Sequence, residues 1–131
     1  MIKPQIMDSF LINKSEKEKI ASFIYFISDG EFIKIGSAYA PERRCAELQT
    51  GNARKLKILF TIPIKLVRGG FSGDIDRTLK AERFLQNVFR EFHVRGEWFD
   101  IMNMIDVNEW AEHFGTTTNK WKKSYREENV I

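Results

Sequence analysis

The sequence predicts a single small α/β domain in which an antiparallel sheet of about three strands is flanked by helices. Three observations support this fold class. The chain has 131 residues, of which 43% are hydrophobic and 13% aromatic, which is enough apolar material for one compact core. Its short apolar runs are rich in aromatic and β-branched residues, as strands are. Between these runs lie segments with the start and stop signals of helices.

The first expected element is a β-hairpin. Phe23–Ile27 is an aromatic and β-branched run that stops at Asp29 and Gly30, a pair with a strong hairpin preference. A second apolar run, Phe32–Ile35, follows at once. We expect the second strand to end at Gly36, where the chain needs a turn before its next element.

A helix and a third strand are expected next. Pro41 suits the first turn of a helix that continues to Gln49, and Thr50–Asn52 ends it. The following strand is expected at Leu56–Ile64, with Pro63 favouring an edge or a strand end. Along this strand, one face is predicted to carry Leu56, Ile58, Phe60 and Ile62.

The longest helix is predicted to begin at Asp74 or Asp76 and to run to Phe92. A loop around Gly96 and a short helix at Val107–Phe114 are expected after it. We therefore divide the chain into an N-terminal extension at residues 1–21, a domain at 22–114 and a basic tail at 115–131.

Cationic side chains gather in two parts of the chain, whose formal net charge is +3. Between residues 43 and 68, seven basic residues stand against one acid, which suits phosphate contact, although a solvated face could carry the same charge. The tail interleaves cations with Trp121 and Tyr125, which suits base stacking, although Trp121 packing back on the domain is equally open. The candidate DNA contacts are Arg43, Arg54, Lys55, Lys57, Arg95, Lys122 and Lys123.

Composition excludes several other classes. The one cysteine, Cys45, cannot form an internal disulfide and has no zinc-ligand spacing around it. The first ten residues lack the apolar run of a signal peptide, and no stretch has the length of a membrane span. We therefore expect an intracellular protein with no membrane partner.

An ordered set of residues spans the hairpin and the two predicted helices after it. Phe23, Ile24 and Tyr25 lie on the first strand, and Lys34, Ile35 and Gly36 close the second. Arg44 follows on the next predicted helix, and Glu82 lies on the later one. In this order the residues resemble the pattern of the GIY-YIG nuclease superfamily, with the first three at the GIY element and the next three at the YIG element. The wider match covers roughly residues 22 to 101 and resembles the branch labelled phage DNA-binding domain or meiotically up-regulated gene product. It includes Pro41–Arg44, Leu48–Asn52, Ala81–Leu85 and Arg95–Phe99.

The resemblance implies a catalytic role for each of these residues. Tyr25 would be the general base, Arg44 a phosphate clamp and Glu82 the sole protein ligand of one Mg²⁺ or Mn²⁺ ion. The residue types suit these roles, because an arginine fork matches a phosphate bidentately and a carboxylate is a hard ligand for Mg²⁺. Lys34 replaces the second tyrosine, and its ammonium group is expected to favour the Tyr25 phenolate. Whether Tyr25 or Lys34 takes the proton stays open, because the two would titrate together.

The sequence therefore predicts a divalent-metal-dependent endonuclease that hydrolyses DNA phosphodiesters in a phage or mobile element. Sequence specificity would be low, or it would come from a homodimer or from a partner protein. The alternative is a DNA-binding or regulatory module that kept the fold and does not cut. A pure binder would have no use for Glu82, because an unmetallated carboxylate repels DNA. His93 lies close to Arg95 in the chain, and the sequence does not decide whether it reaches the site.

Overall fold

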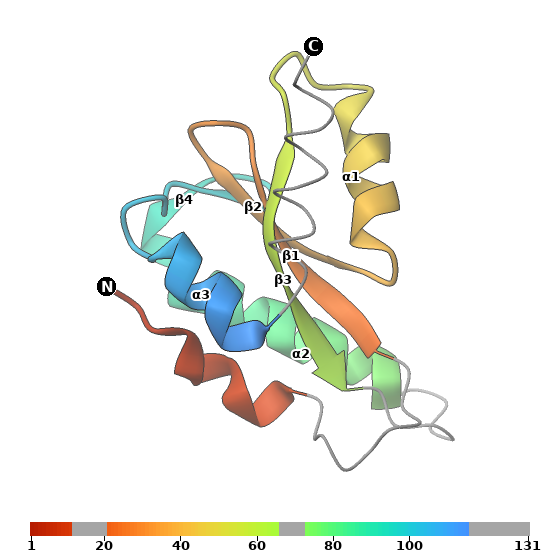
Figure 1. The fold of residues 1–131 in the computed structure, drawn as a ribbon, viewed down its shortest axis with the longest axis vertical. Helices are drawn as coiled ribbons and strands as arrows, with labels where there is room; N and C mark the ends of the chain where they lie inside the picture. Colours follow the sequence, from red (N-terminus) through yellow and green to blue (C-terminus); the bar gives the residue numbers. More distant parts are fainter. Residues whose placement is uncertain (12–20, 66–72, 116–131) are drawn as a thin grey trace.

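A five-stranded antiparallel sheet forms the centre of the computed structural model, which describes residues 1–11, 21–65 and 73–115 (Figure 1). The strand order is β3-β1-β2-β5-β4. The strands are β1 (Ala21–Ser28), β2 (Ile33–Ala38), β3 (Lys57–Lys65), β4 (His93–Arg95) and β5 (Trp98–Phe99). The α/β class is therefore confirmed, whereas the expectation of about three strands omits β4 and β5.

The predicted hairpin is confirmed by the antiparallel pairing of β1 with β2. Gly30 has a φ of 100°, a value that glycine adopts readily. Asp29 Oδ1 accepts hydrogen bonds from the backbone N–H of Glu31 at 2.9 Å and of Phe32 at 2.7 Å, which fixes the turn. Strand β2 does not end at Gly36 but continues to Ala38, still paired with β1.

The helices follow their local signals closely. The α-helices are α1 (Pro41–Gln49), α2 (Gly73–Val88) and α3 (Val107–Phe114), and two 3₁₀ helices are η1 (Pro4–Phe10) and η2 (Arg90–Phe92). The predicted bounds of α1 and α3 are confirmed. The long helix was expected to reach Phe92, but α2 ends at Val88 and the chain tightens into η2 before β4. None of the helices in the described part of the chain has both the length and the apolar character needed to cross a membrane.

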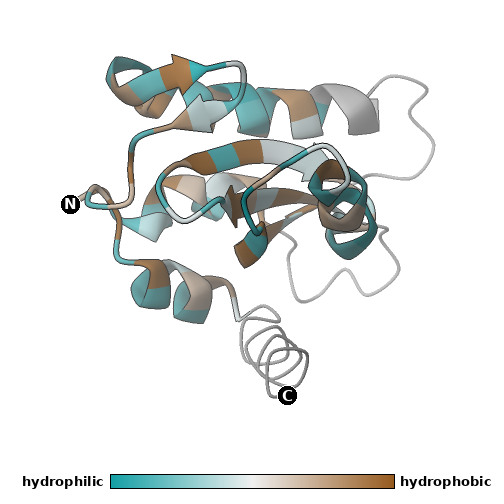
Figure 2. Ribbon diagram, turned by 90° about the horizontal axis from the view of Figure 1, so that it is seen from above, coloured by the Kyte–Doolittle hydropathy of each residue, from teal (hydrophilic) through white to brown (hydrophobic). Residues whose placement is uncertain are grey.

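The two faces of the sheet are covered differently. One face packs against η1, α2 and α3 in a single core that includes Phe26, Phe60 and Trp110. The other face carries a smaller cluster beneath α1, which includes Tyr25 and Ile58. Figure 1 shows α1 and α3 on opposite sides of β1 and β3, and Figure 2 shows that the central strands are largely hydrophobic while the helices carry hydrophilic stretches. Tyr25 therefore lies on the α1 side of the sheet.

A bulge in β3 changes which residues face each cluster. Phe26 pairs with Phe60, but Ile27 pairs with Ile58, so Leu59 has no partner on β1. Ile58 consequently joins the cluster beneath α1, while Phe60 faces the main core. The predicted single face through Leu56, Ile58, Phe60 and Ile62 is therefore wrong, because strict alternation fails at the bulge. The edge position of β3, suggested by Pro63, is confirmed.

The first residues of the chain are part of the core. Met7 on η1 is fully buried in the main cluster. The Trp110 indole Nε1 donates a hydrogen bond to the Ile2 carbonyl oxygen at 3.0 Å, and the Ile2 N–H donates to the Met104 carbonyl oxygen at 3.0 Å. These contacts tie the segment before β1 to α3 and to the loop before it.

Met7→Ala is expected to lower the free energy of unfolding by about 2–5 kcal/mol, because it removes buried thioether contacts and leaves a cavity. Gln5→Ala is the matched control, since Gln5 lies on the same 3₁₀ helix with its side chain exposed. Urea denaturation of both variants measures the difference. Equal stability of the two variants would show that η1 does not contribute to the core.

Candidate functional site

The Tyr25 ring on β1 lies directly against Gly36 on β2. The two residues are direct partners in the antiparallel register, and Tyr25 is 2% exposed. A Cβ atom at position 36 would overlap the Tyr25 hydroxyl group and its ring carbon. The phenol ring therefore lies across β2 at the one position in that strand with no side chain, and only glycine permits this placement.

Side chains of α2 occupy the outer edge of β2 beyond the point where β5 stops. Strand β5 pairs with Ile33 and Lys34 only, and the Ile35 N–H donates to the Glu97 carbonyl oxygen at 3.0 Å. Gln86 Nε2 then donates to the Ile35 carbonyl oxygen at 3.1 Å. The Ser37 hydroxyl group donates to Glu82 Oε2 at 2.9 Å. At this edge, side chains of α2 thus form hydrogen bonds with β2 where a neighbouring strand would otherwise pair.

Glu82 meets a second carboxylate, Glu97, at the same edge. The side chains of Glu82 and Glu97 are within hydrogen-bonding distance of each other, and Gln86 Nε2 lies 3.3 Å from Glu82 Oε1. Burial raises the pKa of Glu82, and the Ser37 hydrogen bond opposes this rise while Glu97 adds to it. Two carboxylates at this distance repel unless a proton or a cation lies between them. Glu82 is only 8% exposed, so water screens this repulsion poorly.

The two cations of the site have other partners than the sequence suggests. Lys34 Nζ forms an ion pair with Glu97 Oε2 at 3.3 Å, whereas the Arg44 guanidinium group lies close enough to the Tyr25 hydroxyl group to influence its pKa. Burial and the Glu97 charge raise the pKa of Tyr25, and Arg44 acts in the opposite direction. The expectation that Lys34 lowers the pKa of Tyr25 is therefore wrong, since Lys34 is engaged by a carboxylate and Arg44 takes its place.

Arg44 remains available to a further anion. Its side chain is 47% exposed, and its Nη1 lies 3.4 Å from Glu47 Oε2, one helical turn away. An exposed pair of this kind is weak, so it competes poorly with a phosphate. The Arg44 guanidinium group therefore lies near the buried Tyr25 hydroxyl group on one side and is exposed to solvent on the other.

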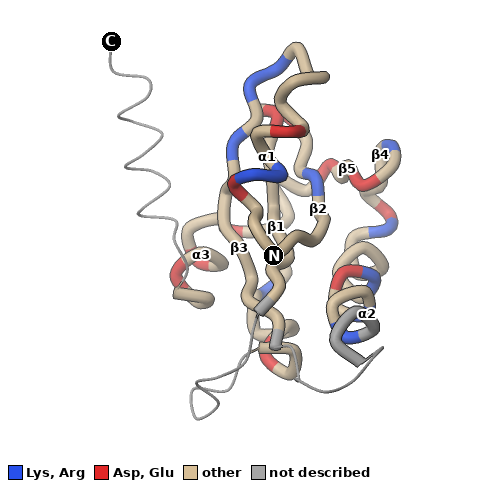
Figure 3. The backbone as a smooth tube through the Cα atoms, turned by 90° about the vertical axis from the view of Figure 1, so that its right-hand side faces the viewer, with Lys and Arg blue, Asp and Glu red and all other residues tan. Residues whose placement is uncertain are grey.

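The candidate DNA contacts lie in several segments. Figure 3 shows cationic positions around α1 and the connection that follows it, with acidic positions among them. Arg43 Nε lies 3.6 Å from Glu47 Oε1, and Arg54 Nη1 lies 3.0 Å from Glu31 Oε2 and 3.6 Å from Asp29 Oδ2. The fold thus brings the hairpin acids beside the basic segment and reduces its local charge. Lys55 and Lys57 are exposed at the start of β3, Arg95 is exposed on β4, and Lys122 and Lys123 fall outside the described residues.

His93 does not join the cluster at β2. Its ring Nε2 is 2.7 Å from the Gly96 carbonyl oxygen, and its ring packs edge-on against Phe99 at 5.3 Å. It stabilises the β4–β5 hairpin, whose turn residue Gly96 has a φ of 54°.

Sequence reasoning missed three members of the site. Ser37 directly follows Gly36, Gln86 lies one helical turn after Glu82, and Glu97 lies between Gly96 and Trp98. The spacing of Glu82 and Gln86 was a usable signal, because residues four apart share a helix face. The approach of Glu97 to Glu82 had no local signal, since it depends on the β4–β5 hairpin folding back against β2.

The arrangement combines groups that suit phosphoryl chemistry. A phenol, a guanidinium group and two carboxylates converge from β1, α1, α2 and the β4–β5 turn. In residues 1–11, 21–65 and 73–115, no three His, Cys, Asp or Glu side chains gather so that they could hold a metal ion between them. A pair of carboxylates remains a suitable donor set for Mg²⁺, which keeps several of its waters and needs one or two carboxylates.

Comparison with known proteins gives one family. Residues 22–115 match the family model described as the T5orf172 domain. Comparisons with curated proteins and with solved structures gave no match. The matched segment runs from β1 to the residue after α3, so it contains Tyr25, Arg44, Glu82 and Glu97. Because the match covers most of its length, the chain belongs to the T5orf172 domain family.

Proposed function

We propose that this protein is a GIY-YIG type endonuclease that hydrolyses DNA phosphodiester bonds with one divalent metal ion. The observation that carries the proposal is the convergence of Tyr25, Arg44 and Glu82 at the outer edge of β2. Membership of the T5orf172 family supports it, because that domain suggests a phage-associated nuclease-like or DNA-binding module.

Arg44 binds the scissile phosphate in this proposal. Charge builds on the non-bridging oxygens as the phosphodiester is attacked, and a fixed guanidinium fork stabilises it. The proximity of the Tyr25 hydroxyl group restricts one side of the fork, which limits the freedom that phosphate binding must remove. Arg43, Lys55 and Lys57 are exposed, and in this proposal they add positive charge along the bound strand.

Glu82 and Glu97 would hold the metal ion. The fit rests on their mutual contact, because a cation relieves the repulsion that otherwise requires a shared proton. When bound, Mg²⁺ or Mn²⁺ supplies a Lewis acid that stabilises charge on the leaving oxygen. Lys34 orients Glu97 through its ion pair, and Ser37 orients Glu82. Lys34 is therefore a positioning residue in this proposal.

Tyr25 takes the proton from the attacking water. Burial and Glu97 hold the phenol protonated, so Arg44 is the group that favours the phenolate. Gly36 keeps the hydroxyl group at the edge of β2, near Glu82. The base and the phosphate clamp are thus neighbours, and the charge of one influences the pKa of the other.

A non-cutting DNA-binding module is the second candidate, and the raised pKa of Tyr25 favours it, because a protonated phenol is no base. In that case the cationic residues around α1 bind the backbone and the carboxylates are structural. In either case we propose that sequence specificity comes from a second copy of the chain or from a partner protein.

Cleavage of DNA is the direct test. Wild type is expected to nick or cut plasmid DNA with Mg²⁺ or Mn²⁺, and Glu82→Gln and Arg44→Ala are each expected to lower the rate by a factor of about 100 or more. Arg83→Ala is the matched control, because Arg83 is exposed on α2 beside Glu82 in sequence. Tight DNA binding by wild type without cleavage of double-stranded, single-stranded or branched DNA would establish the binding module instead.

Metal binding is tested separately by thermal unfolding. Folding raises the pKa of Glu82 above its ordinary value of 4.5. The stability of the metal-free protein therefore falls as the pH rises from 4.5 through the raised pKa of the folded state. Glu82→Gln removes this loss and is expected to have a higher Tm than wild type at pH 7 without metal. Mn²⁺ is expected to raise the Tm of wild type and to leave that of Glu82→Gln unchanged. An equal Mn²⁺ shift in both proteins would place the metal elsewhere.

Gly36→Ala tests the placement of the phenol. The new methyl group displaces the Tyr25 hydroxyl group, so cleavage is expected to fall at least as far as in Tyr25→Phe. Gly51→Ala is the control, because a Cβ atom there meets nothing within 4 Å. Cleavage rates are compared after circular dichroism shows that both variants fold. Full activity of Gly36→Ala would mean that the hydroxyl position does not matter.

A further inference from the structure

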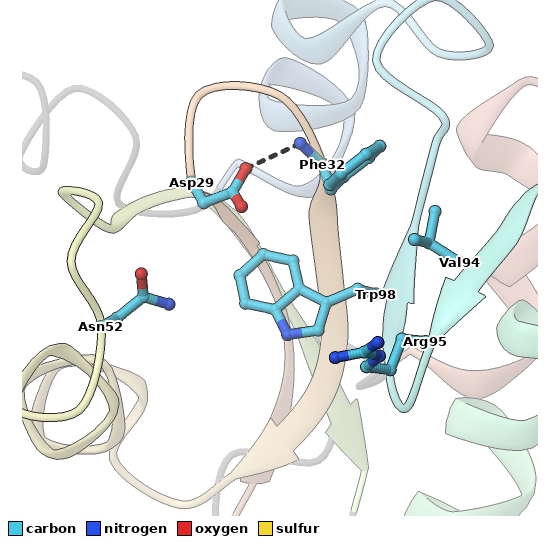
Figure 4. A pocket seen from close by; sticks show the side chains of 6 residues that line it. All are labelled: Asp29, Phe32, Asn52, Val94, Arg95 and Trp98. Carbon is cyan, nitrogen blue, oxygen red and sulfur yellow. Dashed lines mark hydrogen bonds between the residues drawn. The ribbon is translucent and has the colours of Figure 1, made fainter.

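A pocket lies beside the candidate active site, between the β1–β2 turn, the connection after α1 and the β4–β5 hairpin (Figure 4). It has a volume of about 320 Å³. Small-ligand sites run from roughly 300 to 1,000 Å³, so this one suits a single small planar group. Its lining residues are Asp29, Phe32, Asn52, Val94, Arg95 and Trp98.

The pocket has an aromatic wall. Figure 4 shows the Trp98 indole in the middle of these side chains, with Asn52 on one side and Phe32 and Val94 on the other. The Trp98 side chain is partly buried against the cluster that includes Tyr25, which fixes the orientation of its ring. A rigid aromatic face next to an opening is a platform on which another ring can stack.

The polar groups around the opening are unused donors. Asn52 Oδ1 accepts from the Arg54 N–H at 3.0 Å, which leaves its amide nitrogen on the side facing Trp98 (Figure 4). Within the part of the chain that the structure describes, that nitrogen, the Trp98 indole N–H and the Arg95 guanidinium group have no hydrogen-bond acceptor.

The Asp29 carboxylate does not offset these donors. It is held by the turn N–H groups and lies 3.6 Å from Arg54 Nη1, so its charge is already compensated. The lining therefore favours a planar ring that carries acceptors, with an anion close to it.

Lys34 connects this pocket to the candidate active site. Its ammonium group is 5.7 Å from the centre of the Trp98 ring and 3.3 Å from Glu97 Oε2. Glu97 in turn contacts Glu82. A group stacked on Trp98 is thus one side chain away from the carboxylates.

We propose that this pocket binds one unpaired nucleobase of the DNA, next to the phosphodiester at the active site. The base stacks on Trp98, its ring or carbonyl acceptors receive the Asn52 amide, and Arg95 contacts its phosphate. This inference rests on the proposed function and specifies the substrate as DNA with an unpaired or extruded nucleotide at the cut. A paired base cannot enter, because its faces are covered by its neighbours in the stack.

The test is a binding measurement without divalent metal, so that cleavage plays no part. Three labelled duplexes are compared: one with a single-nucleotide bulge, the same bulge with an abasic residue, and the fully paired duplex. Wild type is expected to bind the bulged duplex about tenfold more tightly than the abasic one, since stacking on an aromatic side chain contributes roughly that factor or more. Taking the ratio within each protein removes its general attraction for phosphates.

Trp98→Leu is expected to bring that ratio close to one. Asn52→Asp keeps the acceptor for the Arg54 N–H but replaces the free donor with an oxygen, so it tests the pocket without altering the core. It is expected to reduce the ratio several-fold. Tyr39→Leu is the control, because Tyr39 is an exposed aromatic residue that does not line the pocket.

Equal binding of bulged and abasic duplexes by wild type overturns this inference, as does an unchanged ratio in both Trp98→Leu and Asn52→Asp. Together with the cleavage assay, these measurements distinguish failure of this inference from failure of the proposed nuclease activity. A base preference without any cleavage would support the pocket and reject the nuclease, whereas cleavage with no base preference would do the reverse.

Discussion

The passage of the Tyr25 ring over Gly36 is the constraint on which the rest of the site depends. It places a hydroxyl group from the interior strand β1 at the outer edge of β2, where Arg44 and Glu82 arrive from two helices. Any larger residue at position 36 would push the phenol away and separate these groups. The site is therefore fixed by the sheet, and the helices only supply side chains to a position that the hairpin has already defined.

The charges around Glu82 and Tyr25 then decide whether these two groups are protonated. Two carboxylates and two cations occupy the edge of β2, and each cation has a partner: Lys34 pairs with Glu97, and Arg44 pairs with the Tyr25 hydroxyl group. Burial raises the pKa of both Glu82 and Tyr25, so without a further cation both groups are driven towards their protonated forms. In our proposal Glu82 and Glu97 would hold a metal ion and Arg44 would bind a phosphate, which would complete this balance.

The sequence correctly predicted those elements whose turn or helix-end residues have strong conformational preferences. The Asp29–Gly30 turn and the Pro41–Gln49 and Val107–Phe114 helices were placed correctly, because turn and cap preferences act over a few residues. The short strands β4 and β5 were missed, since they are stabilised by pairing with β2 and carry no periodic pattern of their own. The partner of Lys34 was missed for a related reason: Lys34 was expected to act on Tyr25 but pairs with Glu97, because a long side chain finds its partner through tertiary geometry.

A crystal of the protein with Mn²⁺ and an uncleavable oligonucleotide would test the central claim most directly, because anomalous scattering locates manganese without reference to the protein coordinates. Our account predicts a manganese peak within coordination distance of the Glu82 and Glu97 carboxylates, with a phosphate group on Arg44. Manganese at another position, or DNA bound away from the edge of β2, would contradict it.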